Sequence, residues 1–98
     1  VINRPMSYSI MVNPNVAFRE IEDESVLLHL GRSRYFGLDD IATRAWLLFR
    51  EHSRLNEIVD ILLKEYDVEP ANLRTDLESF VSNLVDNGLV TVHRDNEP

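Results

Sequence analysis

The amino-acid sequence predicts an α+β domain in which a three-stranded antiparallel sheet precedes three α-helices. Before Asp39 the apolar residues occur in short runs separated by polar turns, whereas after Asp39 they recur every three or four residues. The chain has 98 residues, which corresponds to one small domain with a single core. Because a sheet of three strands cannot form a core alone, the helices are expected to pack on one of its faces.

Three short segments ahead of Asp39 have the features of strands. They are residues 16–21, 26–30 and 35–38, and the polar turns between them are residues 22–25 and 31–34. Alternation along the second segment places Leu27 and His29 on the face opposite Val26 and Leu28. Four-residue turns between short strands are typical of an antiparallel meander.

Three amphipathic stretches follow and predict helices. Asp39 is the expected N-cap of the first, which ends near residue 52, and Ser53 is the expected N-cap of the second, which runs to residue 66. Pro70 suits the first position of the third helix. Gly88 is expected just past its end, with Leu89 closing a Schellman-type contact.

The two ends of the chain show no helical pattern. Residues 1–15 are expected to form an extended N-terminal segment, because prolines and asparagines interrupt it. Residues 16–92 form the predicted domain, which ends in a short extended stretch over residues 89–92. Residues 93–98 are expected to form a flexible tail.

The composition excludes several kinds of chemistry and partner. The chain has no cysteine, which removes disulfides, thiolate metal sites and cysteine nucleophiles. Its formal net charge of −7 argues against binding to nucleic acid or to an anionic membrane surface. The apolar runs are far shorter than the roughly 18–20 residues that cross a bilayer, and the N-terminus lacks the pattern of a secretory signal. We therefore expect a cytoplasmic protein.

No group of residues is arranged for catalysis. His29, His52 and His93 lie in separate segments, the serines lack a GxSxG motif, and the three glycines stand alone. Asp39 and Asp40 fall at a predicted helix start, where acidic residues are common. His29 is expected to face solvent or to be partly packed. The sequence therefore predicts a protein that is not an enzyme and that holds no metal and no cofactor.

Two aromatic groups allow more than one interpretation. Trp46 and Phe49 could form an aromatic pair that binds a partner, but core packing is the favoured interpretation, with part of the Trp46 ring left exposed by the helical spacing. Tyr35, Phe36 and Gly37 form the last predicted strand, one side of which can lack a neighbour. An open edge can recruit a peptide as an added strand. Periodicity alone slightly favours ordinary packing of these residues in the core or against a neighbouring strand.

Several stretches together resemble the PqqD-like family. They are Leu-Leu-His-Leu at 27–30, Arg-Tyr-Phe-Gly-Leu-Asp at 34–39 and Ala-Thr-Arg-Ala-Trp at 42–46, followed by 58–62, 65–68, 76–80, Leu84 and 88–90. The resemblance covers roughly residues 16–90. Asp39 stands where the family more often has asparagine, and both residues can cap a helix. The resemblance implies a winged helix-turn-helix-like fold with a three-stranded sheet and three helices.

The resemblance also implies a binding site. Members of this family bind the leader segment of a precursor peptide, which docks as an extra antiparallel strand on the third strand, beside the third helix. The implied peptide-binding residues are Tyr35, Phe36, Gly37, Asp76, Phe80 and Asn83. The strand residues would act through backbone groups, Phe80 would form the wall of an apolar pocket, and Asp76 and Asn83 would lie at its rim.

The resemblance implies a stand-alone recognition protein for ribosomally made, post-translationally modified peptides. Its expected partners are the leader and separate maturation enzymes. These are a leader peptidase and an ATP-dependent cyclase in lasso-peptide pathways, which we favour, or a radical SAM enzyme in pyrroloquinoline quinone synthesis. Two other functions stay open: a winged-helix DNA-binding regulator, and a dimerisation domain in which the open edge pairs with its own copy.

Overall fold

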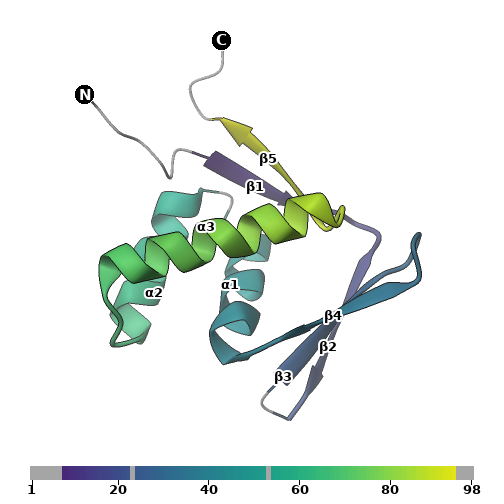
Figure 1. The fold of residues 1–98 in the computed structure, drawn as a ribbon, viewed down its shortest axis with the longest axis horizontal. Helices are drawn as coiled ribbons and strands as arrows, with labels where there is room; N and C mark the ends of the chain where they lie inside the picture. The colour runs from purple at the N-terminus through teal and green to yellow at the C-terminus, as the bar shows by residue number, and fades with distance from the viewer. Residues whose placement is uncertain (1–7, 23, 53, 95–98) are drawn as a thin grey trace.

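The computed structural model describes residues 8–22, 24–52 and 54–94, in which four strands precede three helices and a fifth strand follows (Figure 1). The elements are β1 (Tyr8–Val12), β2 (Val16–Ile21), β3 (Glu24–His29), β4 (Arg34–Leu38), α1 (Asp40–Glu51), α2 (Leu55–Glu65), α3 (Pro70–Asp86) and β5 (Val90–Arg94). The predicted α+β class is confirmed, and a two-stranded sheet is added to it.

Strands β2, β3 and β4 form the predicted antiparallel sheet in that order. The register places Leu27 opposite Phe18 and Phe36, so these three side chains share one face. The predicted turn over residues 22–25 is too long, because β3 begins at Glu24 and Ser25 is a strand residue. Its hydroxyl lies 2.7 Å from that of Thr43 in α1, which satisfies both buried polar groups.

The inner face of β3 carries Ser25, Leu27 and His29 rather than the more apolar residues between them. The expectation that His29 faces solvent or is only partly packed is therefore wrong, since this residue is 8% exposed. Its Nδ1 accepts a hydrogen bond from the backbone N–H of Arg32 at 3.2 Å. That bond lowers the cost of burying an imidazole ring.

The second sheet consists of β1 and β5, and the pattern of the sequence did not predict it. β1 lies within the expected extended segment, and β5 contains most of the stretch predicted to be extended near the C-terminus. Ile10 is 2% exposed and belongs to the core. The side-chain amide of Asn13 donates to the carbonyl oxygen of Gly88 at 2.8 Å, which ties the turn after β1 to the end of α3.

Helix α1 is enclosed on more sides than its amphipathic pattern indicates, because it contacts β1, β3, β4 and α2. Trp46 is only 1% exposed, so the predicted partial exposure of its ring is wrong. The predicted core position of Phe49 is confirmed, and its ring packs edge-on against Trp46 with centroids 6.4 Å apart. The unpredicted strand β1 supplies part of this extra cover.

The predicted ends of α1 and α3 are confirmed, whereas the N-cap of α2 is Arg54. The Asp39 side chain accepts a hydrogen bond from the backbone N–H of Ala42 at 2.9 Å, and Pro70 occupies the first turn of α3. The predicted cap Ser53 lies outside the described residues. The backbone N–H groups of Gly88 and Leu89 donate to carbonyl oxygens of the last turn of α3, which is the expected Schellman arrangement.

Gly88→Ala is expected to destabilise the protein by about 1–2 kcal/mol. Gly88 has a φ of +74°, and an added Cβ would lie 3.2 Å from Cζ of Arg32 and 3.3 Å from Nε2 of His29. Gly37→Ala is the matched control, because a Cβ there meets no atom within 4 Å. Urea unfolding measures both variants. An equal loss of stability in the two would contradict the special role of Gly88.

An ion pair joins α1 to α2. The Arg44 guanidinium donates to the two carboxylate oxygens of Glu65 at 2.8 and 2.7 Å. This hydrogen bonding lowers the pKa of Glu65, because it favours the ionised carboxyl. A carboxyl whose pKa is lower in the folded state stabilises the fold above its unfolded pKa. That contribution is lost as the pH falls through the folded pKa.

Glu65→Gln is expected to lower stability slightly near neutral pH and to have no effect in acid below the folded pKa of Glu65. The effect is small because both side chains are partly exposed and water screens the pair. Urea unfolding across pH checks this. Arg44→Gln should reproduce the result, and the double variant should be no less stable than either single one. A loss of stability independent of pH would contradict the prediction.

Candidate functional site

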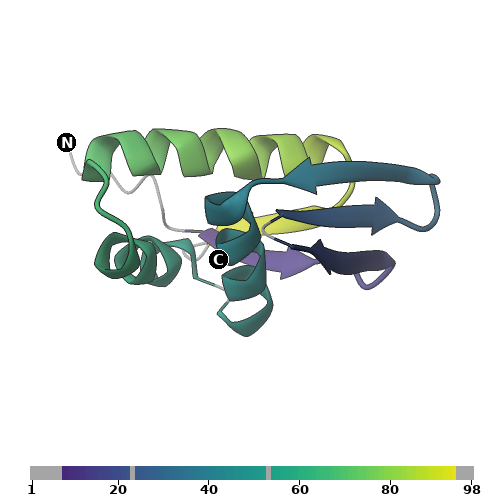
Figure 2. The ribbon, with the colours of Figure 1, turned by 90° about the horizontal axis from the view of Figure 1, so that it is seen from below.

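The site begins at an open edge of the three-stranded sheet. Within the described residues β4 pairs with β3 alone, so the backbone groups along its other edge have no strand partner. Figure 2 shows β4 as the strand of this sheet that lies nearest to α3. The strand has neither proline nor lysine to block pairing with a further strand. The edge is therefore competent to accept an extended segment.

A cavity of about 300 Å³ opens where the start of α1 faces α3. Most of its wall is apolar and two carboxylates complete it; the lining residues are Asp39, Ile41, Ala42, Ala45, Leu73, Asp76, Leu77 and Phe80. Of the α3 residues, Leu73, Leu77 and Phe80 are three or four positions apart and Asp76 is adjacent to Leu77, so the four line one side of that helix. A pocket of this kind suits an apolar side chain that has a polar or cationic neighbour.

Phe80 forms part of the cavity wall and packs against a core residue, Phe49. Its ring stacks on that of Phe49 with centroids 6.1 Å apart and an angle of 24° between the ring planes. Phe49 is buried in turn against Trp46. The wall is therefore supported by the core, which keeps the cavity formed without a ligand.

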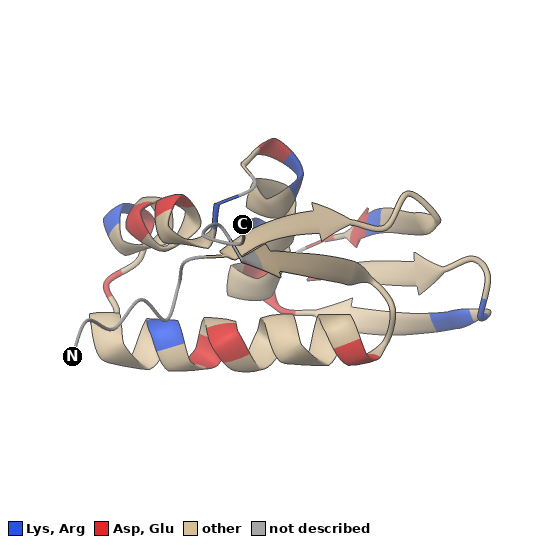
Figure 3. Cartoon of the chain, turned by 90° about the horizontal axis from the view of Figure 1, so that it is seen from above, with Lys and Arg blue, Asp and Glu red and all other residues tan. Residues whose placement is uncertain are grey.

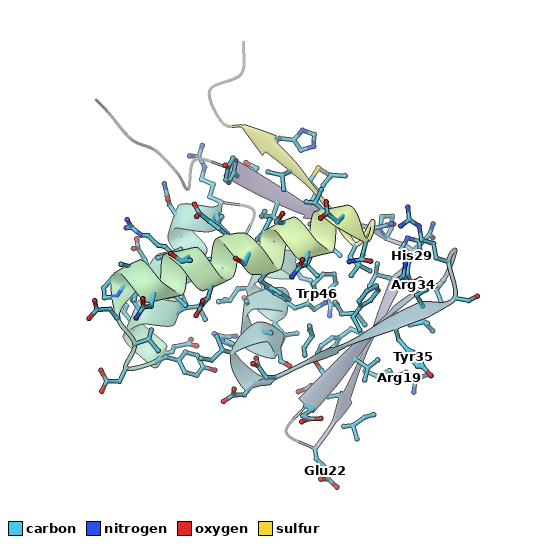
Figure 4. The ribbon with its side chains drawn as sticks, viewed as in Figure 1. Arg19, Glu22, His29, Arg34, Tyr35 and Trp46 are labelled. Carbon is cyan, nitrogen blue, oxygen red and sulfur yellow. The ribbon has the colours of Figure 1, made fainter. Side chains whose placement is uncertain are left out.

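The three predicted strand residues do not share one face. Phe36 points inward opposite Leu27, is half-buried, and has the guanidinium of Arg34 5.7 Å from its ring centroid. The Tyr35 side chain points to the outer face, where it is 70% exposed, and Gly37 has no side chain to place on either face. Figure 4 shows the Tyr35 side chain on the sheet, away from α3. Only the backbone of these two residues can serve the edge beside α3.

Of the three peptide-binding residues predicted on α3, the structure places only two at the cavity. Asp76 and Phe80 line the cavity, whereas Asn83 is not among its lining residues. Asp39 was expected only as a helix cap, and Ile41 was not predicted at the site. Both come to the cavity because α1 starts immediately after β4. The sequence gives one indication of this position, because a strand that leads directly into a helix brings the first turn of that helix to the end of the strand. Here β4 ends at Leu38 and α1 begins at Asp40.

The cavity has a negative rim. Within the part of the chain that the structure describes, the Asp76 carboxylate has no hydrogen bond or ion pair, whereas Asp39 is engaged in capping α1. Figure 3 shows that acidic residues outnumber basic ones along α3. This charge disfavours phosphate binding and therefore the winged-helix DNA-binding interpretation, which requires a basic helix.

Two other features, a metal site and a membrane-spanning helix, were sought in residues 8–22, 24–52 and 54–94. No group of three or more histidine or acidic side chains there could hold a metal ion. None of the helices in the same residues is long and apolar enough to cross a bilayer.

Comparisons with known proteins point to one family. Residues 24–90 match the family model for coenzyme PQQ synthesis protein D (PqqD). A solved structure described as TbiB1 in complex with the TbiA(beta) leader peptide is 35% identical, with a TM-score of 0.76 over 90% of this chain and 98% of that one. A second, lasso peptide synthetase B1 complexed with the leader peptide, is 25% identical, with a TM-score of 0.70 over 85% and 98%. No curated protein sequence matches the chain.

Proposed function

The chain belongs to the PqqD family, and from this we propose that it binds the leader segment of a ribosomally made precursor peptide and has no catalytic activity of its own. The observation that carries the proposal is the free edge of β4 beside a preformed, largely apolar cavity. The two similar structures support it, because both were solved with leader peptides bound.

The leader is proposed to add to β4 as an antiparallel strand. Backbone hydrogen bonds to residues 34–38 would supply affinity with little dependence on sequence. Alternate side chains of an added strand would point to the same face as Phe36, which packs against the core. One of these side chains would enter the cavity, where Phe80 provides an apolar wall. Tyr35 and Gly37 would contribute backbone groups only.

The charges of the site favour a particular kind of leader. The side chain in the cavity would be apolar, and a lysine or arginine close to it in the leader would lie near Asp76 and Asp39. The rim is in contact with water, so this pairing would contribute little affinity and mainly select orientation. Asn83 does not line the cavity, and we propose only that it contacts the leader farther along α3.

We also propose which separate enzymes use the bound leader. We favour a lasso-peptide pathway, with a leader peptidase and an ATP-dependent cyclase as partners. The likeness to a lasso peptide synthetase B1 supports this choice. Pyrroloquinoline quinone synthesis with a radical SAM enzyme is the alternative, and the family model supports it. The genes that neighbour this one distinguish the two pathways.

The test is a titration of the protein into a fluorescently labelled leader from the neighbouring precursor gene. Saturable binding with a micromolar or lower dissociation constant is expected, and a scrambled leader should not bind. Sedimentation in the same buffer measures whether the open edge instead pairs with a second copy. Absence of saturable binding by a leader from the protein's own gene cluster would overturn the proposal.

A further inference from the structure

The three-stranded sheet has an outer face that does not pack against the core. Alternation along the strands places six side chains on it, those of Ala17, Arg19, Ile21, Val26, Leu28 and Tyr35. Val26 and Leu28 are half-buried, yet neither packs against the core. Figure 4 shows Arg19 and Tyr35 on the side of the sheet away from α3. None of the six residues lines the cavity beside α3, so the leader cavity does not account for this face.

The outer face is apolar and open. Ile21 and Tyr35 are 60% and 70% exposed, and Leu30, directly after β3, is 57% exposed. Gly37 pairs with Val26 in the register, and a Cβ added to it would meet no atom within 4 Å, so nothing in the described residues fills the space beside it. Neighbouring exposed apolar residues on a small domain commonly mark a surface that binds another macromolecule.

Charge and size argue against a second copy of this chain as the occupant of the outer face. Two copies would each carry a formal net charge of −7 and would repel one another. Arg19 is the one cation among the six residues, and within the described part of the chain it forms no ion pair. Three strands of this length span about 14 by 18 Å, a footprint on the order of 250 Å². Even if the relief of the side chains doubles that area, it is below the roughly 800 Å² that each partner contributes to a stable interface.

A bound leader would enlarge this face. A strand added to β4 sends every second side chain to the side of the sheet on which Tyr35 lies. These leader side chains would continue the outer face beyond β4, whereas the intervening ones would point toward the core side of the sheet. A protein that docks on the outer face would therefore contact the leader as well, and it could distinguish the loaded protein from the free one. The separate enzyme that acts on the leader is the partner that needs this distinction.

We propose that the outer face, together with the bound leader, is the docking surface for the maturation enzyme that acts on the leader. This inference rests on the proposed leader binding. The matching surface of the enzyme would be apolar where it meets Ile21 and Tyr35 and would carry a carboxylate that faces Arg19. Because the leader supplies part of the interface, the enzyme would bind the loaded protein more tightly than the free protein.

Biolayer interferometry tests the proposal with each maturation enzyme encoded beside the precursor gene, purified separately. Each enzyme is titrated onto the immobilised protein, which is either free or saturated with the leader peptide. At least one enzyme is expected to bind the loaded protein at least about tenfold more tightly than the free protein. Absence of binding by every enzyme, or equal affinity for the two forms, would overturn the proposal.

Two pairs of variants assign the binding to the outer face. Arg19→Glu and Ile21→Asp change β2, two strands from the free edge of β4, and each is expected to weaken the enzyme at least about tenfold without changing leader affinity. Arg50→Glu and Val85→Asp make the same kinds of change at exposed residues outside the face and should stay within about twofold of the parent. Parent-like enzyme binding by Arg19→Glu and Ile21→Asp would overturn this proposal alone. Failure of the parent to bind the leader would overturn the proposed function and this inference with it.

Discussion

Phe80→Asp is expected to reduce leader affinity by at least about a hundredfold, because it replaces the apolar wall of the cavity at the centre of the proposed interface. The new carboxylate would lie beside Asp76 and Asp39, and an apolar leader side chain would have to desolvate it. Fluorescence anisotropy with the labelled leader measures the change. No other substitution at the leader site is expected to have a larger effect.

Val85→Asp is the matched control for that experiment. It introduces the same charge at an exposed residue of the same helix, outside the cavity beside α3. Its leader affinity should stay within about twofold of the parent, as is usual for residues outside an interface. Phe80→Leu keeps the wall apolar and should lose much less affinity than Phe80→Asp. Parent-like binding by Phe80→Asp would show that the leader does not use this cavity.

Ile10→Ala is expected to destabilise the protein by about 2–5 kcal/mol, the usual cost of removing a buried isoleucine side chain. Ile10 is 2% exposed in β1 and packs with the core formed by both sheets and the helices. The adjacent Met11 is 58% exposed on the opposite face of the same strand. Met11→Ala should therefore change the unfolding free energy by less than about 0.5 kcal/mol.

Urea unfolding of these two variants decides whether β1 is an integral part of the domain. A large loss in Ile10→Ala alone means that the strand is needed for the fold. Equal, small losses in both variants would mean that β1 adds little to the stability of residues 16–92, the domain expected from the sequence. The comparison is sharp because the two substitutions are adjacent and remove side chains of similar size.

Structural features that depend on residues close together in the sequence were predicted correctly. Asp39 caps α1, Pro70 begins α3, and Gly88 with Leu89 ends it as the spacing indicated. The strands of the meander also lie within one or two residues of their predicted ends. In each case the interacting residues are only a few positions apart, so the sequence pattern that produces the feature can be recognised in the sequence.

Burial of individual residues was less predictable. His29 and Trp46 were both expected to be more exposed than they are. His29 is buried because the inner face of β3 is the one whose Ser25 hydroxyl reaches Thr43 on α1. A count of apolar residues on each face of the strand contains no information about such a bond. The cover over α1 likewise depends on β1, which belongs to a different part of the chain.

The spacing of residues along the chain is enough to specify the order of β2, β3, β4, α1, α2 and α3, the ends of α1 and α3, and the apolar stripe of α3 that includes Phe80. The pairing of β1 with β5 and the position of Ile41 beside α3 are settled by packing alone. The tie between Asn13 and Gly88, for example, joins residues 75 positions apart. Contacts over such separations depend on how whole elements fit together, and no local period records that fit.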